Sequence, residues 1–184
     1  MNIKTTKIAG VLILEPKVFY DDRGYFLESY NQKTLQNNDI SISFVQDNQS
    51  FSKYGTIRGL HYQKGDSAQV KLIRVLKGEI LDVVVDLRMN SKTYGQSLAV
   101  KLSSDNNLQL LIPKGLAHGF SVLSEDAIIF YKCDNFYNKE AESGIIYNDT
   151  DLDIDWQVPI DMRIISQKDL NLQTFKQYRE NPCF

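Results

Sequence analysis

The sequence predicts an all-β protein, a double-sheet jelly roll, from two observations. Short runs rich in Val, Ile, Tyr and Phe recur along most of the chain, and turn-forming groups such as DDRG, LKGE and SSDNN separate them. The strand-helix alternation of a doubly wound nucleotide-binding fold is missing. Many short antiparallel strands must hide their edges, and a jelly roll does so by arranging them in two sheets. We therefore expect a barrel whose mouth is the natural ligand site.

The expected strands follow the apolar runs in chain order. The first lies within 8–14, and the others are 25–30, 42–47, 56–63, 70–76, 79–87, 97–102, 108–112, 118–123 and 127–133. Helical periodicity is confined to 33–37 and to a segment near the C-terminus, 168–179. The helices are therefore expected to be short and peripheral.

Length and composition indicate one folded domain over residues 1–184. A chain of 184 residues with 42% hydrophobic content can build one substantial core, and it contains no linker, repeat or low-complexity tract. The net charge of −2 and the scattered basic residues argue against binding to nucleic acid or to an anionic membrane. No apolar run reaches the length of a membrane span.

The N-terminal run and the cysteines bear on the compartment. The run 8–14 is followed by Glu15, Pro16 and Lys17 instead of a small-residue cleavage site, which favours a strand over a signal peptide. Two cysteines, Cys133 and Cys183, do not make a disulfide framework. We expect a cytoplasmic protein.

One histidine lies in the strand segment TIRGLHYQ. Along a regular strand, His61 and Arg58 would point to opposite faces. Gly59 lies between them, and a glycine inside a strand pattern often marks a bulge or a close backbone approach. We expect a bulge at Gly59 that lets both side chains reach one ligand.

Two further positions carry candidate chemistry. His118 begins an apolar run after the turn at Pro113 and Gly115, and Lys71 is flanked by apolar residues that would half-bury its stem. A lysine in such a site supplies a fixed positive charge for a developing oxyanion. Taken alone, each residue also fits a structural role, such as a lysine that extends from the sheet to solvent.

The strand segment AIIFYKCDNFYN adds two tyrosines. Tyr131 and Tyr137 fall on one face of an extended segment, so both can look toward the same cavity. Aromatic residues on strands usually belong to the core. In a cavity, however, a tyrosine hydroxyl can donate a proton, and an aromatic face can stack on a base.

Metal binding is disfavoured by the histidine pattern. His61 is followed by Tyr62 and Gln63, so the His-x-His pair of metal-binding barrels is missing. Two histidines with a carboxylate would still suffice for a facial triad. We expect no metal site.

The motifs together resemble one family over almost the whole chain. DDRGYFLESYN, VQDNQS, IRGLHYQ, AQVKLIRVLKGEILDVVVDLR, YGQ, IPKGLAHGF, FYKCDNFYN and NDTDLDIDW occur here in an order and spacing similar to those of the dTDP-4-dehydrorhamnose 3,5-epimerases of deoxysugar biosynthesis. The chain departs from the family pattern after Asp155 and Trp156, where Gln157 stands in place of the expected proline.

The resemblance implies a cupin-type jelly roll that works without cofactor or catalytic metal. It also implies a homodimer in which N-terminal strands help to complete the neighbouring subunit's site. The implied reaction converts dTDP-4-dehydro-6-deoxy-D-glucose to dTDP-4-dehydro-L-rhamnose, by proton abstraction beside the C4 ketone and reprotonation from the opposite face.

The resemblance also implies residue roles. His61 is the expected proton acceptor, Tyr131 the proton donor, Lys71 the group that stabilises the enolate, and Asp169 the carboxylate that orients His61. The expected substrate contacts are Arg23, Glu28, Gln46, Asp47, Asn48, Arg58, Lys71, His118, Tyr137, Glu142 and Lys168, with Tyr137 stacking on the nucleobase. Arginine forks suit a pyrophosphate, which gives Arg23 and Arg58 a role that the near-neutral net charge does not reveal.

Three alternatives remain open at this level. Relatives with the same residues can epimerise one carbon only, or act on sugars that carry another nucleotide. A metal-dependent cupin oxygenase would require bound metal for activity. A sugar-binding module would bind without proton exchange, and it would not need a base, an acid and a cation together.

Overall fold

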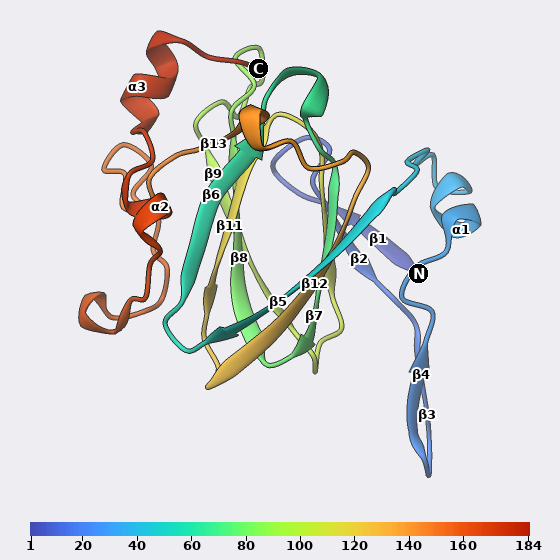
Figure 1. The fold of residues 1–184 in the computed structure, drawn as a ribbon. Helices are drawn as coiled ribbons and strands as arrows, with labels where there is room; N and C mark the ends of the chain where they lie inside the picture. Colours follow the sequence, from blue (N-terminus) through green and yellow to red (C-terminus); the bar gives the residue numbers. More distant parts are fainter.

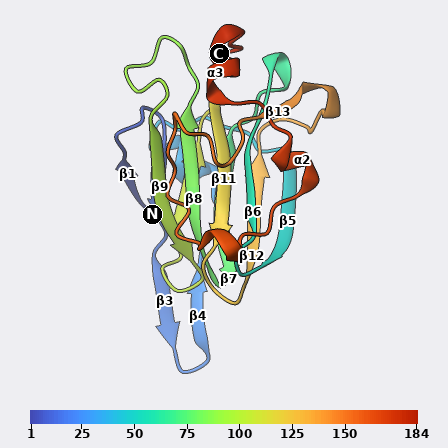
Figure 2. The same cartoon turned by 90° about the vertical axis from the view of Figure 1, so that its left-hand side faces the viewer.

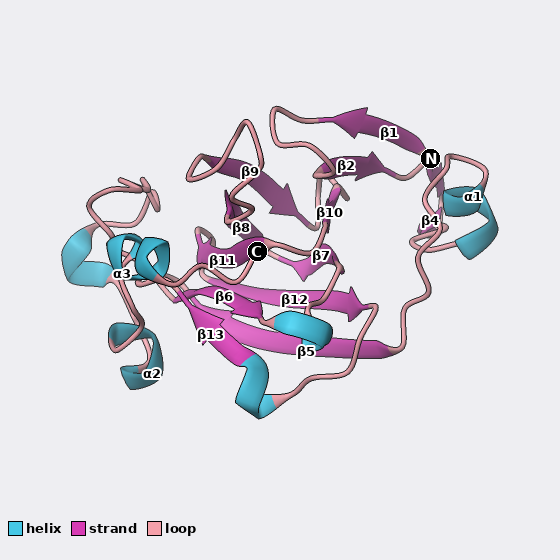
Figure 3. Ribbon diagram, turned by 90° about the horizontal axis from the view of Figure 1, so that it is seen from above, coloured by secondary structure: helices cyan, strands magenta, loops and turns pink.

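The computed structural model describes all residues from Met1 to Phe184 and is built from two antiparallel β-sheets around a common interior (Figures 1 and 3). The first sheet has the order β1 (Asn2–Thr5), β2 (Leu12–Glu15), β10 (Gln109–Ile112), β7 (Lys71–Lys77), β12 (Asp126–Cys133), β5 (Gln46–Lys53). The second has the order β13 (Glu142–Gly144), β6 (Ile57–Gln63), β11 (Leu116–Val122), β8 (Glu79–Asp86), β9 (Ser97–Ser103). The expected two-sheet jelly roll is confirmed.

The main core lies between the two sheets, and β8 is buried on both of its faces. Ile80 and Val84 face this inner core, whereas Leu81 and Val83 face a second core on the outer side of the sheet. A strand covered on both faces has no solvent side and therefore reads as a nearly continuous apolar run. This explains the segment EILDVVVD.

The C-terminal segment covers the outer face of the second sheet (Figure 2). Trp156 is fully buried there, and its indole Nε1–H donates a hydrogen bond to the carbonyl oxygen of Tyr147 at 2.7 Å. α2 (Gln167–Leu170) and α3 (Phe175–Glu180) lie on this side of the molecule, and α1 (Gln32–Gln36) lies on the opposite side, where Leu35 packs on the first sheet (Figure 3). Three single-turn 3₁₀ helices occur at Gly65–Ser67, Lys139–Ala141 and Ile160–Met162.

Three expected elements differ from the structure. The first strand is Asn2–Thr5, with Leu12–Glu15 second, so the segment before Leu12 turns instead of extending. The C-terminal helix is two helices, because Thr174 starts α3 with a capping box that it forms with Gln177. The strand expected at 42–47 lies at Gln46–Lys53 instead.

The displaced strand β5 is polar except for Phe51. Its even-numbered residues turn toward the barrel interior, and its odd-numbered residues are exposed. The preceding apolar residues belong to a loop, in which Phe44 packs edge-on against Tyr30 at 5.6 Å between ring centroids. The alternation of apolar and polar residues that predicted a strand therefore lies in the loop. The real strand, β5, has no such alternation because it faces a polar cavity.

The bulge expected at Gly59 is present. β6 pairs with β11 through His61 opposite His118 and through Arg58 opposite Phe120, so the register shifts by one residue between these pairs. Gly59 has φ +121°, and a Cβ on it would lie 2.5 Å from the Cα of Gly119. Only glycine permits this conformation together with this close approach of two strands.

A separate hairpin, β3 (Val18–Asp21) with β4 (Gly24–Leu27), extends away from the two sheets (Figure 1). Four aromatic side chains on it are more than half exposed: Phe19, Tyr20, Tyr25 and Phe26. Such a group of exposed aromatic residues is typical of an interaction site. No helix in the structure is long and apolar enough to cross a membrane.

Candidate active site

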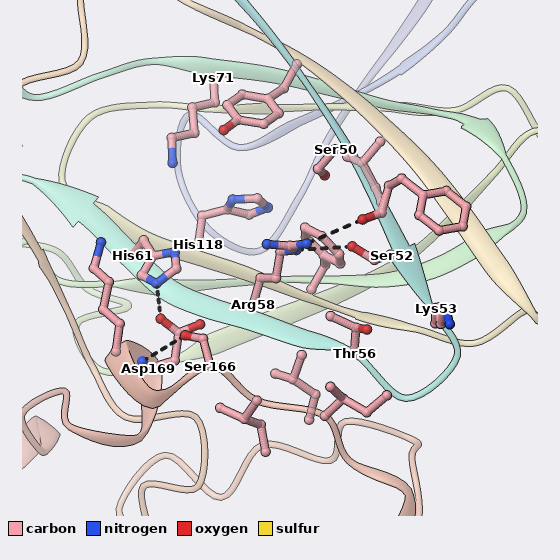
Figure 4. A pocket seen from close by; sticks show the side chains of 18 residues that line it. Ser50, Ser52, Lys53, Thr56, Arg58, His61, Lys71, His118, Ser166 and Asp169 are labelled. Atoms are coloured by element: carbon pink, nitrogen blue, oxygen red, sulfur yellow. Dashed lines mark hydrogen bonds and ion pairs between the residues drawn. The ribbon is translucent and has the colours of Figure 1, made fainter.

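A cavity of about 640 Å³ opens into the interior between the two sheets (Figure 4). Polar side chains from both sheets and from the C-terminal segment line it, among them Ser50, Ser52, Arg58, His61, Lys71, His118, Tyr131, Ser166, Lys168 and Asp169. A smaller cavity of about 140 Å³ shares three of these side chains, His61, Lys71 and Tyr131, and adds Gln46, Asn48, Tyr137 and Glu142. Most of the expected site residues therefore lie around one connected space.

His61 and Asp169 form a hydrogen-bonded pair. The Nε2 atom of His61 lies 2.7 Å from Oδ1 of Asp169, which comes from α2, 108 residues further along the chain (Figure 4). The other carboxylate oxygen accepts a hydrogen bond from the backbone N–H of Gly59 at 3.2 Å. Burial by itself would raise the pKa of Asp169, but the contact with His61 and the other hydrogen bonds lower it overall. The carboxylate is thus held ionised against the ring.

A local cap places Asp169. Ser166 is the N-cap of α2, and its side-chain oxygen accepts a hydrogen bond from the backbone N–H of Asp169 at 3.1 Å. The same bond fixes the position of the carboxylate-bearing residue at the third helical position. The substitution of proline by Gln157 upstream has not moved Asp169 away from His61.

Lys71 brings an unpaired positive charge to the cavity. Its Nζ atom lies 5.9 Å from the centre of the Tyr131 ring, and no carboxylate forms an ion pair with it. Burial lowers the pKa of the Lys71 ammonium, whereas nearby Cys133 and Asp82 act in the opposite direction. A buried cation without an anion partner interacts strongly with any negative charge that enters the cavity.

Tyr131 lines both cavities. Burial raises the pKa of its hydroxyl group above the ordinary value. The phenol therefore stays protonated across the neutral range and is able to donate a proton.

Arg58 points into the same space as His61 because of the bulge (Figure 4). Its Nε–H donates a hydrogen bond to the Ser52 hydroxyl at 3.1 Å, and its terminal nitrogen donates to the carbonyl oxygen of Phe51. No carboxylate pairs with it, so the guanidinium group is available to an anion. Sequence reasoning missed Ser52, whose only signal was its place in a polar strand.

A second charged group lies at the edge of the smaller cavity. Glu142 accepts a hydrogen bond from the Tyr137 hydroxyl at 2.6 Å and pairs with the Lys168 ammonium at 2.5 Å. Burial opposes ionisation of Glu142, but these two contacts lower its pKa overall. Tyr137 is half exposed and lines the smaller cavity.

His118 lies opposite His61 in the sheet and has its own carboxylate partner. Its Nε2 atom is 2.7 Å from Oδ1 of Asp82, a fully buried residue in the middle of β8. Asp82 was not singled out from the sequence. Its only signal was a charged residue at an inward position of the apolar run 79–87.

Three of the expected substrate contacts do not face the cavity of their own chain. Arg23 is at the tip of the β3–β4 hairpin and pairs with Asp21, and Glu28 accepts a hydrogen bond from Asn31 outside the barrel. Asp47 points to the outer face of β5. Its carboxylate pairs there with Lys132 at 2.9 Å.

Other features complete the inventory of reactive groups. Cys133 and Cys183 are free thiols. No group of three or more His, Cys, Asp or Glu side chains is arranged to hold a metal ion.

The fold and this site together define a class of protein. A two-sheet roll whose cavity holds a histidine-carboxylate pair, a free lysine and a buried tyrosine is suited to moving protons at carbon next to a carbonyl group, because base, acid and oxyanion stabiliser are all present. This class is that of jelly-roll isomerases.

Comparison with known proteins identifies the family. A family model described as dTDP-4-dehydrorhamnose 3,5-epimerase matches residues 5–177. The dTDP-4-dehydrorhamnose 3,5-epimerase of Methanothermobacter thermautotrophicus is 48% identical over 97% of this chain and 95% of that protein. The chain belongs to the dTDP-4-dehydrorhamnose 3,5-epimerase family.

Solved structures agree with this assignment. The crystal structure of dTDP-4-dehydrorhamnose 3,5-epimerase from Elizabethkingia anophelis NUHP1 has a TM-score of 0.91 and 50% identity, over 96% of this chain and 97% of that one. The dTDP-6-deoxy-D-glucose-3,5-epimerase of Legionella pneumophila, solved in complex with dTDP-4-keto-L-rhamnose, has a TM-score of 0.91 and 45% identity, over 95% of this chain and 93% of that one.

Proposed function

We propose that this chain is a dTDP-4-dehydrorhamnose 3,5-epimerase that converts dTDP-4-dehydro-6-deoxy-D-glucose to dTDP-4-dehydro-L-rhamnose. The observation that carries the proposal is the convergence of the His61–Asp169 pair, the unpaired Lys71 and the protonated Tyr131 on one cavity. Family membership supports the choice of substrate. The reaction moves protons only, so these side chains supply every group that it uses.

The proposed base is Nδ1 of His61. Nε2 is occupied by Asp169, whereas Nδ1 makes no hydrogen bond within the chain, and the residue lines the cavity. The carboxylate fixes the tautomer with the proton on Nε2 and stabilises the imidazolium ion that forms. His61 therefore takes the proton from the carbon beside the C4 ketone.

Lys71 is the proposed stabiliser of the enolate. Proton loss beside a ketone moves negative charge to the carbonyl oxygen, and a fixed cation binds that charge more strongly in the transition state than in the ground state. Tyr131 then donates its proton to the opposite face of the carbon, which inverts the configuration. The two side chains come from neighbouring strands, β7 and β12.

The nucleotide part of the substrate is assigned to the remaining polar groups. Arg58 and Lys168 suit the pyrophosphate, and the half-exposed ring of Tyr137 suits stacking on the nucleobase. The other proposed contacts within the chain are Gln46, Asp47, Asn48, His118 and Glu142, with Asp47 requiring its pair with Lys132 to open.

We assign Arg23 and Glu28 to the site of a neighbouring subunit in a homodimer. This assignment is supported by their absence from the lining of their own chain's two cavities and by the exposed aromatic hairpin that carries Arg23. We also propose that the chain acts as a single domain over 1–184 and that it works in the cytoplasm.

The test is incubation with dTDP-4-keto-6-deoxyglucose in deuterated water, followed by trapping of the product with a ketoreductase. We expect deuterium at both C3 and C5 and an L-configured product, both read by NMR. Exchange at one carbon only would reassign the chain as a single-site epimerase.

Two further outcomes would overturn the proposal. Binding of the nucleotide sugar without any proton exchange would indicate a binding module. Activity that requires stoichiometric iron, measured by metal analysis of the purified protein, would indicate an oxygenase.

A further inference from the structure

Asp82 is a carboxylate in an apolar environment. Its neighbours on the inward face of β8, Ile80 and Val84, belong to the core between the two sheets, since residues two apart in a strand share a face. Asp82 itself is fully buried. Burial of a carboxylate is costly unless its oxygens find hydrogen-bond donors.

Only one oxygen of Asp82 finds a donor. Oδ1 lies 2.7 Å from Nε2 of His118, whereas Oδ2 is the only buried side-chain nitrogen or oxygen in the chain without a hydrogen-bond partner. In the His61 pair, by contrast, both oxygens of Asp169 accept hydrogen bonds. The burial cost of the Asp82 carboxylate is thus only partly compensated, and its one hydrogen-bond partner is His118.

His118 turns its other nitrogen toward the cavity. Nδ1 makes no hydrogen bond in the chain and is not among the buried unpartnered atoms, so it is accessible from the cavity that the residue lines. Burial lowers the pKa of His118 against the opposing influence of Asp82, and the positive charge of Lys71 lowers it further. The ring is therefore neutral at neutral pH, with one protonated nitrogen and one free lone pair.

We propose that Asp82 is a positioning residue that accepts a hydrogen bond from Nε2–H of His118, and that His118 Nδ1 thereby accepts a hydrogen bond from a hydroxyl group of the bound sugar. The proposal rests on the proposed function for the identity of that sugar. The opposite tautomer would offer an N–H group to the cavity, which any carbonyl, phosphate or hydroxyl oxygen can accept, whereas a free lone pair on Nδ1 requires a donor such as a hydroxyl group. Asp82 thus decides which kind of substrate group His118 recognises.

The first experiment reads the tautomer directly. The chain contains two histidines, so the variant His61→Asn leaves His118 as the only imidazole in untagged protein. We expect ¹⁵N NMR at neutral pH to show a protonated Nε2 and an unprotonated Nδ1. A proton on Nδ1, alone or in an imidazolium ion, would overturn the proposal.

The second experiment separates positioning from structural support. Asp82→Leu replaces the carboxylate by a side chain that matches the surrounding core. We expect its denaturant midpoint to equal or exceed that of the wild type, while kcat/KM falls at least tenfold. A parallel loss of stability and activity would show a structural role and overturn the proposal.

Asp82→Asn is the matched variant of equal size. Its amide carbonyl still accepts from Nε2–H, so it should retain more activity than Asp82→Leu. If the folded Asp82→Asn variant were no more active than Asp82→Leu, the result would contradict the proposal.

A double-mutant cycle tests the route of action. In a His118→Leu background, Asp82→Leu should change kcat/KM by less than twofold, because Asp82 acts only through His118. If Asp82→Leu lowered kcat/KM by the same factor in the His118→Leu background as in the wild type, the proposal would be overturned. The NMR and unfolding measurements need no substrate, so they report on Asp82 separately from the proposed epimerase activity.

Discussion

At the residue scale, the site is built from pairs that combine one reactive side chain with one partner. His61 is held by Asp169, Arg58 by Ser52, and His118 by Asp82. Lys71 is the exception, since its ammonium forms no ion pair with a carboxylate of the chain. The free charge is what an enolate requires.

His61→Asn tests the proposed base. Asparagine can keep a hydrogen bond to Asp169 but cannot accept a proton from carbon, so the turnover number should fall by about 10² to 10⁴. Binding of dTDP, measured by calorimetry, should remain within a few fold of the wild type. Near-normal turnover would remove His61 from the chemical step.

Lys71→Ala tests the stabilisation of the enolate. Loss of one oxyanion-stabilising group typically lowers the rate by about 10² to 10³, and we expect deuterium incorporation at C3 and C5 to fall by that factor. Lys101→Ala is the control, because Lys101 lies on β9 with its ammonium near Glu79, outside the cavity. Undiminished exchange in Lys71→Ala would contradict the role.

At the element scale, the bulge in β6 matters most, because it turns Arg58 and His61 toward the same cavity. It depends on Gly59, whose backbone lies against Gly119 of the neighbouring strand. The loop between β8 and β9 is held in place by hydrogen bonds to one buried carboxylate. Asp86 accepts hydrogen bonds from Arg88, Ser91 and Thr93.

Gly59→Ala should disrupt the bulge. The new Cβ would meet the Cα of Gly119 at 2.5 Å and would also require a φ of +121°, so we expect a loss of unfolding free energy of about 2 to 4 kcal/mol and a large loss of activity. Gly24→Ala is the matched control, since Gly24 has φ +129° but open space around it. Equal losses in the two variants would show that close packing at Gly59 is unimportant.

The pH dependence of stability should reveal Asp86. Burial alone would raise its pKa, but the hydrogen bonds that it accepts outweigh this effect and lower the pKa from 3.8 to about 2. A lowered folded-state pKa stabilises the protein above the unfolded-state pKa, and this contribution disappears as the pH falls from about 4 to about 2.

The expected size of that contribution is about 2 kcal/mol. Denaturant unfolding of the wild type and of Asp86→Asn at several pH values should show the wild type losing that much more stability than the variant across this range. Parallel pH profiles would mean that Asp86 is not the group responsible.

At the scale of the whole molecule, two sheets enclose the cavity, and the hairpin with Arg23 extends away from it. The aromatic side chains of this hairpin are exposed in the single chain, which fits the proposed homodimer. In the proposed homodimer, residues of both subunits form each active site.

Mixing two inactive variants tests this arrangement. If Arg23 serves the neighbouring site, a heterodimer of Arg23→Ala and His61→Asn contains one site with both native residues. We therefore expect activity to appear after the two proteins are unfolded together and refolded, at up to about half of the wild-type value per heterodimer. No recovery, in protein shown to be dimeric by ultracentrifugation, would place Arg23 in its own subunit's site or outside any site.

The sequence by itself determined the fold class, most strand positions and, through the family resemblance, most of the candidate residues. Apolar runs separated by turn-formers are local features, so the strands at 70–76 and 79–87 match β7 and β8 closely. β5 was misplaced because its polar face looks into a cavity instead of a core. The sequence predicted one C-terminal helix because the helical pattern continues through 168–179. The chain instead leaves the helix after α2 and begins a new one at the N-cap Thr174.

Only the tertiary structure decided which residues meet. Asp169 reaches His61 across 108 residues, and Asp82 reaches His118 because β8 and β11 are neighbours in one sheet. Asp47 and Asn48 lie in the same sequence motif and were both expected to contact substrate. Successive side chains of a strand point to opposite faces, so the Asp47 carboxylate lies on the outer face of β5. The physical reason is that local patterns set strands and turns, whereas register, bulges and sheet packing set which side chains share a cavity.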